Sequence, residues 1–465
     1  MFLKQRFYDK MKKVMNMRDS GRTIKAKAIG YDEFGKGIIK EGSESIGIFN
    51  LISGETAEIR ISRNGKYTYT SIQKIIEKSP LRVNPPCKVY NQCGSCQLQH
   101  INYTEQLKLK TDYVKNAFLA YGIIVEPRKI IGMEQPYRYR NKNQFGYGYD
   151  ETGQIVVGLY EEYSHKIVPV MDCLIQDEIT NTIFNSVKDI MKKMKIMPYK
   201  EDAKRGIVRY VVIKRGFSTN QTLVTIVTTV ESFPGKSEFY QAIKEANPTI
   251  NTMVQNVNSR QTSVILGDVE KVIYGKGTIE DHLCGLKFNI SSKSFYQINP
   301  KQTEKLYNKV VEYAALTGNE VVLDTYSGIG TIGLILAKNA KEVYSAELNK
   351  DAHNNAIQNA KLNNIKNVHF FNEDATHFIQ GLAKEKIKVD VVVMDPTRSG
   401  STPEFVNALG QLKPKKIVYV SCEPATQARD IAKIIKKGYV IQEITPIDMF
   451  CQTYHVETIS LLSLK

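Results

Sequence analysis

Three short runs of β-branched residues between Val389 and Glu457 constrain the fold of this chain more than any other feature. The runs lie in VDVVVMDPTRSG, KKIVYVSCEPAT and DMFCQTYHVETISLL, and each has polar residues at or beside its end. In an open parallel sheet, ligands bind at the carboxyl ends of the strands. We therefore expect Asp395, Cys422 and Glu457 to lie together at one sheet edge, where a thiol and carboxyl groups favour covalent catalysis beside a bound cofactor.

A glycine loop upstream predicts the cofactor site. The stretch VVLDTYSGIGTIGLILAKNAKEVYSAELN reads as strand, loop, helix and strand, and Gly328, Gly330 and Gly333 match G-x-G-x-x-G. That pattern serves NAD, FAD and S-adenosylmethionine alike, and Glu347 after the second strand suits the ribose of each. Asp324 ends the first strand ahead of the glycines, where a carboxylate suits a sulfonium better than a pyrophosphate. We therefore favour S-adenosylmethionine over NAD.

The charge of the chain predicts a polyanionic partner. Its 465 residues, enough for about three domains, have a net charge of +16, and the first thirty contain nine Lys and Arg against two Asp. Such a field attracts nucleic acid, although a lysine-rich composition can also serve solubility alone. No run is long enough to span a membrane, and the start lacks the apolar segment of a secretory signal. We expect a soluble cytoplasmic protein.

Short alternating runs from Thr23 to Lys78 predict a small antiparallel β-barrel. The predicted turns fall at Gly35, Gly42 and Asn64-Gly65, because glycine and Asn-Gly favour tight hairpins. Small barrels of this size often bind RNA through one face. A structural barrel without a ligand is the alternative interpretation. Residues 1–15 read as a basic lead-in that is amphipathic or disordered.

Three cysteines on a loop marked by proline and glycine predict a metal centre. Cys87, Cys93 and Cys96 have the spacing C-x5-C-x2-C, and thiolates are the soft ligands that zinc and iron-sulfur clusters select. Either site requires a fourth ligand. Cys173 is the best candidate, since the other cysteines lie in an apolar strand-like run or in the candidate active site. The residues alone suit zinc as well as iron.

Between residues 102 and 275 the pattern predicts helices and strands in mixed order. The run 102–121 has apolar residues at helical spacing and predicts an amphipathic helix. YRYRNKNQFGYGYD mixes Arg138, Arg140 and Lys142 with tyrosines, and RGIVRYVVIKRG is similarly basic. Aromatic and guanidinium groups bind unpaired bases and phosphates, so these stretches predict an RNA surface; a plain cross-strand aromatic ladder is the alternative. Beyond Tyr274 we expect a hairpin and then a helix over 300–315.

Several motifs together resemble the RNA uridine-C5 methyltransferase family. They are DTYSGIGTIG, MDPTRSG, VYVSCEPAT and DMFCQTYHVET. With the barrel and the cysteine set in front, the chain is similar to the branch that makes 5-methyluridine in 23S ribosomal RNA. The resemblance implies a TRAM-like RNA-binding barrel over 1–80, a central α+β region over 81–275 with an iron-sulfur cluster, and a Rossmann-like methyltransferase domain over 276–465. The helix 102–121 could pack on that last domain.

The resemblance also implies residue roles. It assigns Cys87, Cys93, Cys96 and Cys173 to a 4Fe-4S cluster. It places S-adenosylmethionine contacts at Gln297, Tyr326, Glu347 and Asp395, in addition to Asp324, Gly328 and Gly330 of the loop.

In the implied reaction Cys422 adds to carbon 6 of uracil, with its thiolate favoured by Arg398, and Glu457 removes the carbon-5 proton. We expect a monomer acting on an unpaired or flipped uridine. The alternatives are the same reaction on transfer RNA, or an RNA-binding ribosome-assembly protein without catalysis. Relatives acting on transfer RNA usually lack the barrel and the cluster, which favours ribosomal RNA. Cys451 stands where the family commonly has proline, and it adds a second thiol near the site.

Overall fold

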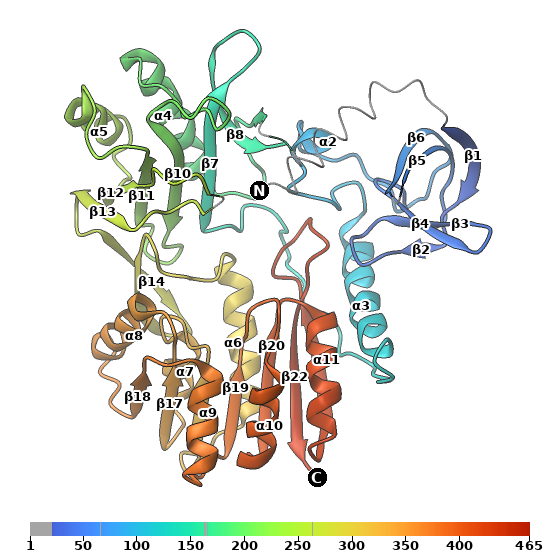
Figure 1. Cartoon of the computed structure of the whole chain (residues 1–465), viewed down its shortest axis with the longest axis vertical. Helices are drawn as coiled ribbons and strands as arrows, with labels where there is room; N and C mark the ends of the chain where they lie inside the picture. Colours follow the sequence, from blue (N-terminus) through green and yellow to red (C-terminus); the bar gives the residue numbers. More distant parts are fainter. Residues whose placement is uncertain (1–20, 66, 162–163, 165, 263) are drawn as a thin grey trace.

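The computed structural model describes residues 21–465 except 66, 162–163, 165 and 263. The expected basic lead-in therefore lies outside the described residues. Three β-rich regions follow one another along the chain, with the amino-terminal strands at the upper right of Figure 1, the central sheet at the upper left and the carboxyl-terminal sheet below. The chain is a mixed α/β protein, as the sequence predicts.

The amino-terminal region consists of two small antiparallel sheets around one apolar core. The first has the order β1-β5-β6 and the second β2-β3-β4. Their bounds are β1 Arg22–Lys27, β2 Gly30–Tyr31, β3 Gly37–Glu41, β4 Glu44–Ile48, β5 Thr56–Asn64 and β6 Tyr67–Glu77. Isoleucines such as Ile39 and Ile59, both fully buried, fill the space between the sheets. The barrel-like arrangement predicted for Thr23 to Lys78 is confirmed, and Gly35, Gly42 and Gly65 have the positive φ that tight turns require.

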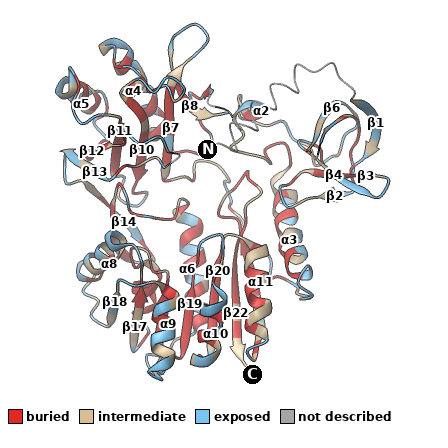
Figure 2. Cartoon of the chain, viewed as in Figure 1, coloured by how far each residue is buried: buried red, intermediate tan, exposed pale blue. Residues whose placement is uncertain are grey.

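The central region is a seven-stranded mixed sheet covered by two helices. Its order is β13-β12-β11-β10-β7-β8-β9. The strands are β7 Lys142–Tyr149, β8 Ile155–Tyr160, β9 Ile167–Pro169, β10 Val208–Arg215, β11 Thr222–Thr228, β12 Thr252–Val257 and β13 Val269–Tyr274, and the helices are α4 Glu178–Met194 and α5 Lys236–Ala246. Asp177 caps α4 by accepting from the backbone N–H of Ile179 and Thr180. Both faces of β10 and β11 are buried (Figure 2).

The carboxyl-terminal region is a second seven-stranded sheet, and it positions the candidate site. Its order is β18-β17-β16-β19-β20-β22-β21, with all neighbours parallel except β22. The strands are β16 Val321–Thr325, β17 Glu342–Ala346, β18 Val368–Phe371, β19 Val391–Met394, β20 Lys416–Ser421, β21 Tyr439–Ile447 and β22 Glu457–Leu464. The strand order reverses between β16 and β19, which makes a crevice at their carboxyl ends.

Helices cover both faces of this sheet. They are α6 Pro300–Ala314, α7 Thr331–Leu336, α8 Lys350–Leu362, α9 Ala375–Lys384, α10 Pro403–Leu412 and α11 Pro424–Ile435, and the hairpin β14 Thr278–Leu283 with β15 Leu286–Ser291 precedes them. Alternate strand residues enter two separate apolar cores, with Val322 in one and Leu323 in the other. The predicted hairpin and the helix over 300–315 are confirmed.

The helix α3, Tyr103–Leu119, joins the core of the carboxyl-terminal region. A short helix α2, Tyr90–Cys93, precedes it. The buried side chains of Val114 and Phe118 pack in the same cluster as Ala428 and Ile431 of α11. The helix predicted over 102–121 is therefore confirmed, and it lies on the sheet that carries the candidate active site (Figure 1). No helix among the described residues is long and apolar enough to cross a bilayer.

Candidate active site

A cleft of about 1120 Å³ opens at the carboxyl ends of the strands, at the point where the strand order reverses. Small-molecule pockets are commonly about 300 to 1,000 Å³, so this cleft is large enough for a cofactor together with part of a second ligand. Predicted site residues that line it are Gln297, Tyr326, Gly328, Glu347, Asp395, Cys422 and Glu457. Asp324 and Gly330 are not among the lining residues.

The turn after β16 forms one wall of the cleft. Tyr326 follows the strand with φ of 81°, and the backbone N–H of Gly328 donates to a carboxylate oxygen of Glu347 at 2.9 Å. The other Glu347 oxygen accepts from the backbone N–H of Asn349 at 2.7 Å. This carboxylate follows β17, as the sequence predicts, and its hydrogen bonds fix it beside the loop.

Asp324 and Gly330 support the glycine loop without lining the cleft. Asp324 is buried and accepts from the backbone N–H of Gly333 at 2.9 Å, which ties the first turn of α7 to β16. A Cβ at residue 333 would approach the Ser345 hydroxyl to 2.6 Å, so glycine permits the close packing of helix and strands. Gly330 precedes α7 with φ of 84°. Both predicted residues therefore shape the loop from outside the cleft.

Cys422, Asp395 and Glu457 meet at the same edge of the sheet. Asp395 directly follows β19 and Cys422 directly follows β20. Glu457 is the first residue of β22, and this strand runs antiparallel to β20 with Thr458 opposite Ser421. The start of β22 therefore lies beside the end of β20. The structure brings together the three residues predicted from the strand ends.

Burial makes the charged forms of these groups unfavourable. It raises the pKa of Glu457 above its usual range, and the neighbouring Asp395 raises it further while Arg398 lowers it. Burial also raises the pKa of Asp395. The pKa of the Cys422 thiol rises to about 11, because burial and then Glu457 raise it more than Arg398 lowers it. Arg398 acts in the predicted direction on the pKa of the Cys422 thiol, although desolvation by burial is the larger effect.

The far wall of the cleft is a segment before α6 that the central sheet holds in place. The Asn141 side chain donates to the backbone oxygen of Gln297 at 2.9 Å. Lys214 donates to the backbone oxygens of Ser291 and Ser294, at 2.7 and 2.6 Å. Sequence reasoning missed Asn141, because only the fold brings it to a residue more than 150 positions away.

The four predicted cysteine ligands line one small cavity. Cys87, Cys93, Cys96 and Cys173 all face it, and the positive φ of Gly94 after α2 turns the chain between the second and third. Burial raises the pKa of Cys96 to about 12, and Cys173 lies close enough to contribute to the rise. Within the described residues, no set of three or more His, Cys, Asp and Glu side chains has the geometry to hold a metal ion.

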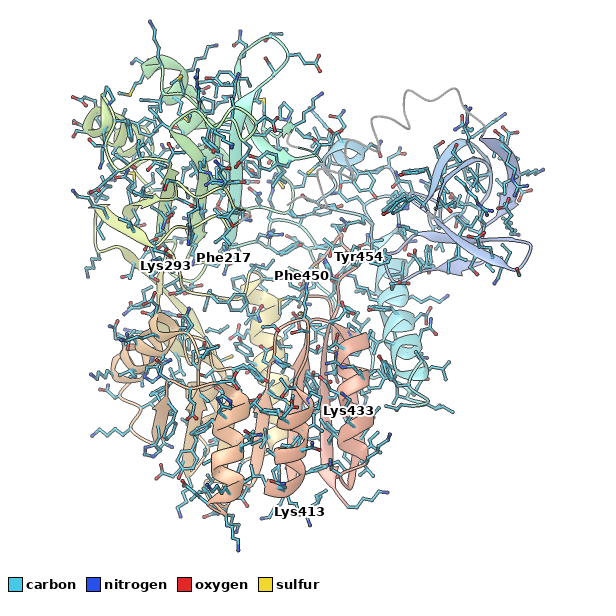
Figure 3. All side chains as sticks on the ribbon, viewed as in Figure 1. Phe217, Lys293, Lys413, Lys433, Phe450 and Tyr454 are labelled. Atoms are coloured by element: carbon cyan, nitrogen blue, oxygen red, sulfur yellow. The ribbon has the colours of Figure 1, made fainter. Side chains whose placement is uncertain are left out.

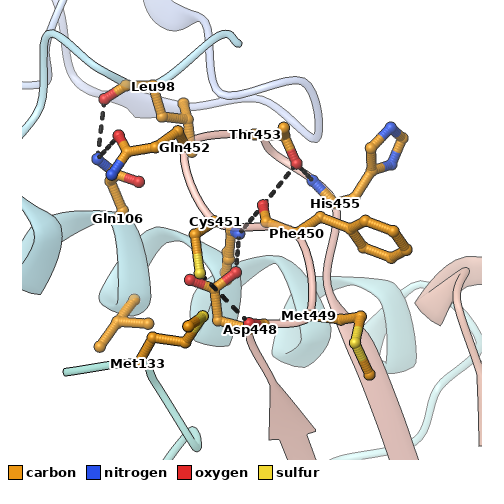
Figure 4. Close-up of polar contacts among 12 residues, drawn as sticks. Leu98, Gln106, Met133, Asp448, Met449, Phe450, Cys451, Gln452, Thr453 and His455 are labelled. Atoms are coloured by element: carbon orange, nitrogen blue, oxygen red, sulfur yellow. Dashed lines mark hydrogen bonds and ion pairs between the residues drawn. The ribbon is translucent and has the colours of Figure 1, made fainter. Parts of the chain in front are cut away.

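The loop from Asp448 to Val456 joins β21 to β22 and is fixed from several sides (Figure 4). Lys110 of α3 forms a fully buried ion pair with Asp448 and also donates to the backbone oxygen of Phe450 at 3.2 Å. Cys451 is fully buried, and its thiol contacts the backbone oxygen of Asp448 at 3.6 Å. This second thiol therefore points into the protein interior, away from the cleft. Phe450, which sequence reasoning left without a role, lines the cleft.

The aromatic stretch YRYRNKNQFGYGYD does not form the predicted RNA surface. Tyr139 and Tyr147 are almost wholly buried, and Phe145 stacks on Phe184 of α4 with ring centroids 4.3 Å apart. Arg138 pairs with Asp172 at 2.6 Å. Phe145 and Tyr147 of β7, together with Tyr139, belong to the core of the central sheet.

The basic stretch RGIVRYVVIKRG is largely internal. Arg205 is exposed, but the other three basic residues are buried, so the prediction that they hold RNA is wrong. Arg209 is buried and donates to the backbone oxygen of Asn258 at 3.0 Å. Arg215 is buried beside Asp177, with the two charged groups 3.3 Å apart. Lys214 is committed to the two serine carbonyls described above. Alternation of basic and β-branched residues usually indicates a strand with one solvent-exposed face. Here, however, the buried basic side chains donate their hydrogen bonds to other parts of the protein.

Comparison with known proteins identifies the family. Residues 102–465 match the tRNA (Uracil-5-)-methyltransferase family. The chain belongs to this family. It is an RNA (uracil-C5)-methyltransferase that uses S-adenosylmethionine, and the resemblance seen in the sequence is confirmed at this level.

Two relatives of similar length match this chain over most of its sequence. An uncharacterized RNA methyltransferase of Clostridium tetani is 42% identical over 431 residues, covering 92% of this chain and 94% of its own. Another from Caldanaerobacter subterraneus is 43% identical over 431 residues, covering 92% and 95%.

A solved structure bears on the question of the RNA. The Pyrococcus abyssi tRNA (uracil-54, C5)-methyltransferase in complex with S-adenosyl-L-homocysteine has a TM-score of 0.76 and 28% identity, and the match covers 94% of this chain and all of that one. The strands over 22–77 make up more than a tenth of this chain, so part of the barrel must lie within the match. A transfer RNA enzyme therefore shares at least part of the barrel, so the barrel alone does not distinguish ribosomal RNA from transfer RNA as the substrate.

Proposed function

We propose that this methyltransferase acts on carbon 5 of a uridine in 23S ribosomal RNA, with Cys422 as nucleophile and Glu457 as base. The observation that carries the proposal is one cleft that is lined by the Cys422 thiol, the buried Glu457, the partly buried Asp395 and the glycine loop. Transfer of a methyl group to an unactivated uracil carbon needs these parts in one place: a nucleophile, a base and a cofactor site.

The thiol activates the ring. Carbon 5 of uracil is a weak nucleophile until the Cys422 sulfur forms a bond to carbon 6, which leaves an enolate with electron density at carbon 5. That carbon would form a bond to the methyl group of S-adenosylmethionine as the bond from the methyl group to the sulfonium sulfur breaks, which leaves S-adenosylhomocysteine. Burial raises the pKa of Cys422 to about 11, so loss of the thiol proton is part of the activation step. Arg398, which lowers that pKa, is placed to stabilise the thiolate.

Glu457 completes the reaction. After methylation, carbon 5 carries both a methyl group and a proton, and the bond from carbon 6 to sulfur breaks once that proton is removed. Glu457 is buried in the cleft beside Cys422. Its raised pKa makes it a stronger base than an exposed glutamate. The proton passes to the carboxylate, its electron pair re-forms the double bond between carbons 5 and 6, and the bond from carbon 6 to sulfur breaks to release the Cys422 thiolate.

The remaining predicted residues of the cleft would hold the cofactor. Glu347 is fixed beside the loop and suits ribose hydroxyls, while Asp395 suits the cationic end of S-adenosylmethionine. Tyr326 and the Gln297 segment form the walls on either side. Asp324 and Gly330 would contribute indirectly, by holding the loop.

We also propose that the four cysteines bind a 4Fe-4S cluster. A single zinc ion needs its thiolates within about 2.3 Å of one point, whereas each cysteine of a cluster binds a different iron. The four thiols line one cavity, which would let them share one centre, and the family resemblance selects the cluster over zinc. Anaerobically purified protein should contain about four irons per chain, and Cys93→Ser should lose iron and sulfide while Cys284→Ser keeps them. Zinc in place of iron would contradict the assignment.

The choice of ribosomal RNA rests on the cysteine set in front of the methyltransferase domain, which resembles the ribosomal RNA branch of the family. We further propose that the enzyme is cytoplasmic and monomeric and that its barrel is TRAM-like. Transfer RNA is the alternative, favoured by the Pyrococcus abyssi match. The test incubates the purified enzyme and labelled S-adenosylmethionine with 23S ribosomal RNA and transfer RNA from cells that lack the gene. We expect label in 5-methyluridine of 23S ribosomal RNA. Label confined to transfer RNA would contradict the proposed target, and label in neither would contradict the reaction.

A further inference from the structure

A row of aromatic side chains runs from the amino-terminal barrel to the cleft. We call it the aromatic track, and it consists of Phe49, Phe34, Tyr454, His455 and Phe450. Phe34 and Phe49 belong to the barrel and are 43% and 49% exposed, although solvent disfavours large apolar rings. The Phe34 and Tyr454 rings meet edge to face with centroids 5.5 Å apart.

The track continues without a gap to the site of chemistry. Tyr454 lies 4.2 Å from His455 between ring centroids, and His455 lies 6.0 Å from Phe450. Phe450 lines the cleft together with Cys422. Figure 3 shows Phe450 and Tyr454 above the carboxyl-terminal sheet, with Tyr454 on the side nearer the barrel. A ligand on the track would therefore lead directly into the cleft.

A cation accompanies the barrel end of the track. The Lys36 ammonium lies 4.1 Å from the centroid of the Phe49 ring and 5.4 Å from that of Phe34. An ammonium over exposed rings provides a charge for phosphate next to faces on which bases stack. In the central sheet, by contrast, Tyr139, Tyr147, Arg209, Lys214 and Arg215 are buried.

The surfaces that carry the track are held rigidly. Gly35 packs so closely that a Cβ there would lie 2.5 Å from the Leu98 side chain and 3.7 Å from Tyr454, which fixes the tip of the barrel against the loop. The backbone N–H groups of Gln97 and Leu98 both donate to the Gln452 oxygen at 3.0 Å, and the Gln106 side chain binds the Gln452 side chain (Figure 4). The rings are thus preorganised, which lowers the entropic cost of binding.

We propose that the aromatic track binds the unpaired nucleotides that flank the target uridine, by stacking their bases between the barrel and the cleft. The inference rests on the proposed function, since it assigns the path by which single-stranded RNA reaches Cys422. Stacking tolerates any base, so the track would hold the strand in place and leave the choice of uridine to other contacts. A protein partner on the same rings is the competing explanation.

The absence of tryptophan from the chain permits a direct test. Phe34→Trp and Tyr454→Trp each introduce a single fluorophore into the full-length protein. The control is Tyr121→Trp, at an exposed residue beyond the end of α3. The probe is an oligouridylate of about 12 nucleotides, and its binding is followed independently by the anisotropy of a terminal dye. An abasic strand of the same length supplies the same charge without bases.

We expect the oligouridylate to quench Phe34→Trp and Tyr454→Trp but to leave Tyr121→Trp unchanged, and the abasic strand to quench none of them. Phe34→Ala and Phe34→Leu should each bind the probe about 5- to 100-fold more weakly, since both lose a stacking face, while Phe34→Tyr should bind normally. If anisotropy shows bound probe but no quenching, or if the abasic strand quenches equally, the inference is wrong and the proposed function stands. Failure of the wild-type protein to bind or methylate any RNA would instead contradict the proposed function.

Discussion

Glu457 and Asp395 are carboxyl groups that burial keeps protonated to higher pH than usual. A cationic sulfonium in the cleft would favour their ionised forms. Proton release then accompanies binding, so the affinity for S-adenosylmethionine should rise between about pH 6 and pH 9 and level off once the carboxyl groups are ionised in the free enzyme. S-adenosylhomocysteine has no sulfonium charge and should respond less. Calorimetric titration of both ligands tests this, and equal pH dependence would contradict it.

Among individual residues, the strand-end positions of Asp395, Cys422 and Glu457 were predictable from the sequence, because a parallel sheet brings such residues to one edge. The hydrogen bond from Gly333 to Asp324 was not, because it depends on how α7 packs on β16. Nor was the burial of Arg209, whose carbonyl partners lie about 50 residues away in sequence. Local pattern cannot specify partners that only tertiary structure supplies.

At the scale of elements, α3 positions the loop between β21 and β22 through the buried pair of Lys110 and Asp448. Lys110→Met should lower the free energy of unfolding by about 3 to 5 kcal/mol, because it leaves a buried carboxylate without its partner. Lys110→Met combined with Asp448→Leu should recover part of the loss. Urea denaturation measures both.

The same helix supplies a control. Lys115 pairs with Glu126 at 2.6 Å on the surface, where Glu126 is mostly exposed. Lys115→Met should cost less than about 1 kcal/mol, as exposed ion pairs do. If the two lysine variants were equally stable, the buried pair would not be what holds the loop to α3. The helix itself was predictable from its apolar spacing, but its packing on α11 required the fold.

For the whole molecule, the charge of +16 predicts RNA binding that weakens steeply with salt. Each phosphate neutralised by a lysine or arginine releases counterions, so the log-log slope should have a magnitude of about one per contact. Lys36→Gln should reduce that magnitude by about one. Lys413→Gln should leave it unchanged, because Lys413 lies at the opposite end of the sheet (Figure 3). A slope independent of salt would contradict binding through phosphates.

At this scale the order of the three regions was predictable from composition and periodicity, from the alternating strands before residue 80 to the glycine loop at 328–333. The surface that we propose to bind RNA was not predictable from the sequence. The sequence offers many basic and aromatic residues, and only burial separates those of the central sheet from those of the barrel. We expect the salt dependence of RNA binding to reflect only the basic residues that are exposed.

The most direct test of the central claim compares Cys422→Ala with Glu457→Gln, because the thiol acts before methyl transfer and the carboxylate after it. With labelled S-adenosylmethionine and substrate RNA, Glu457→Gln should add its thiol and transfer the methyl group, then stall for want of a base. We expect a methylated protein–RNA adduct on a denaturing gel, with Cys422 as the linked residue on peptide mapping. Cys422→Ala should give neither adduct nor product. Normal turnover by Glu457→Gln, or an adduct through Cys451, would contradict the assigned roles.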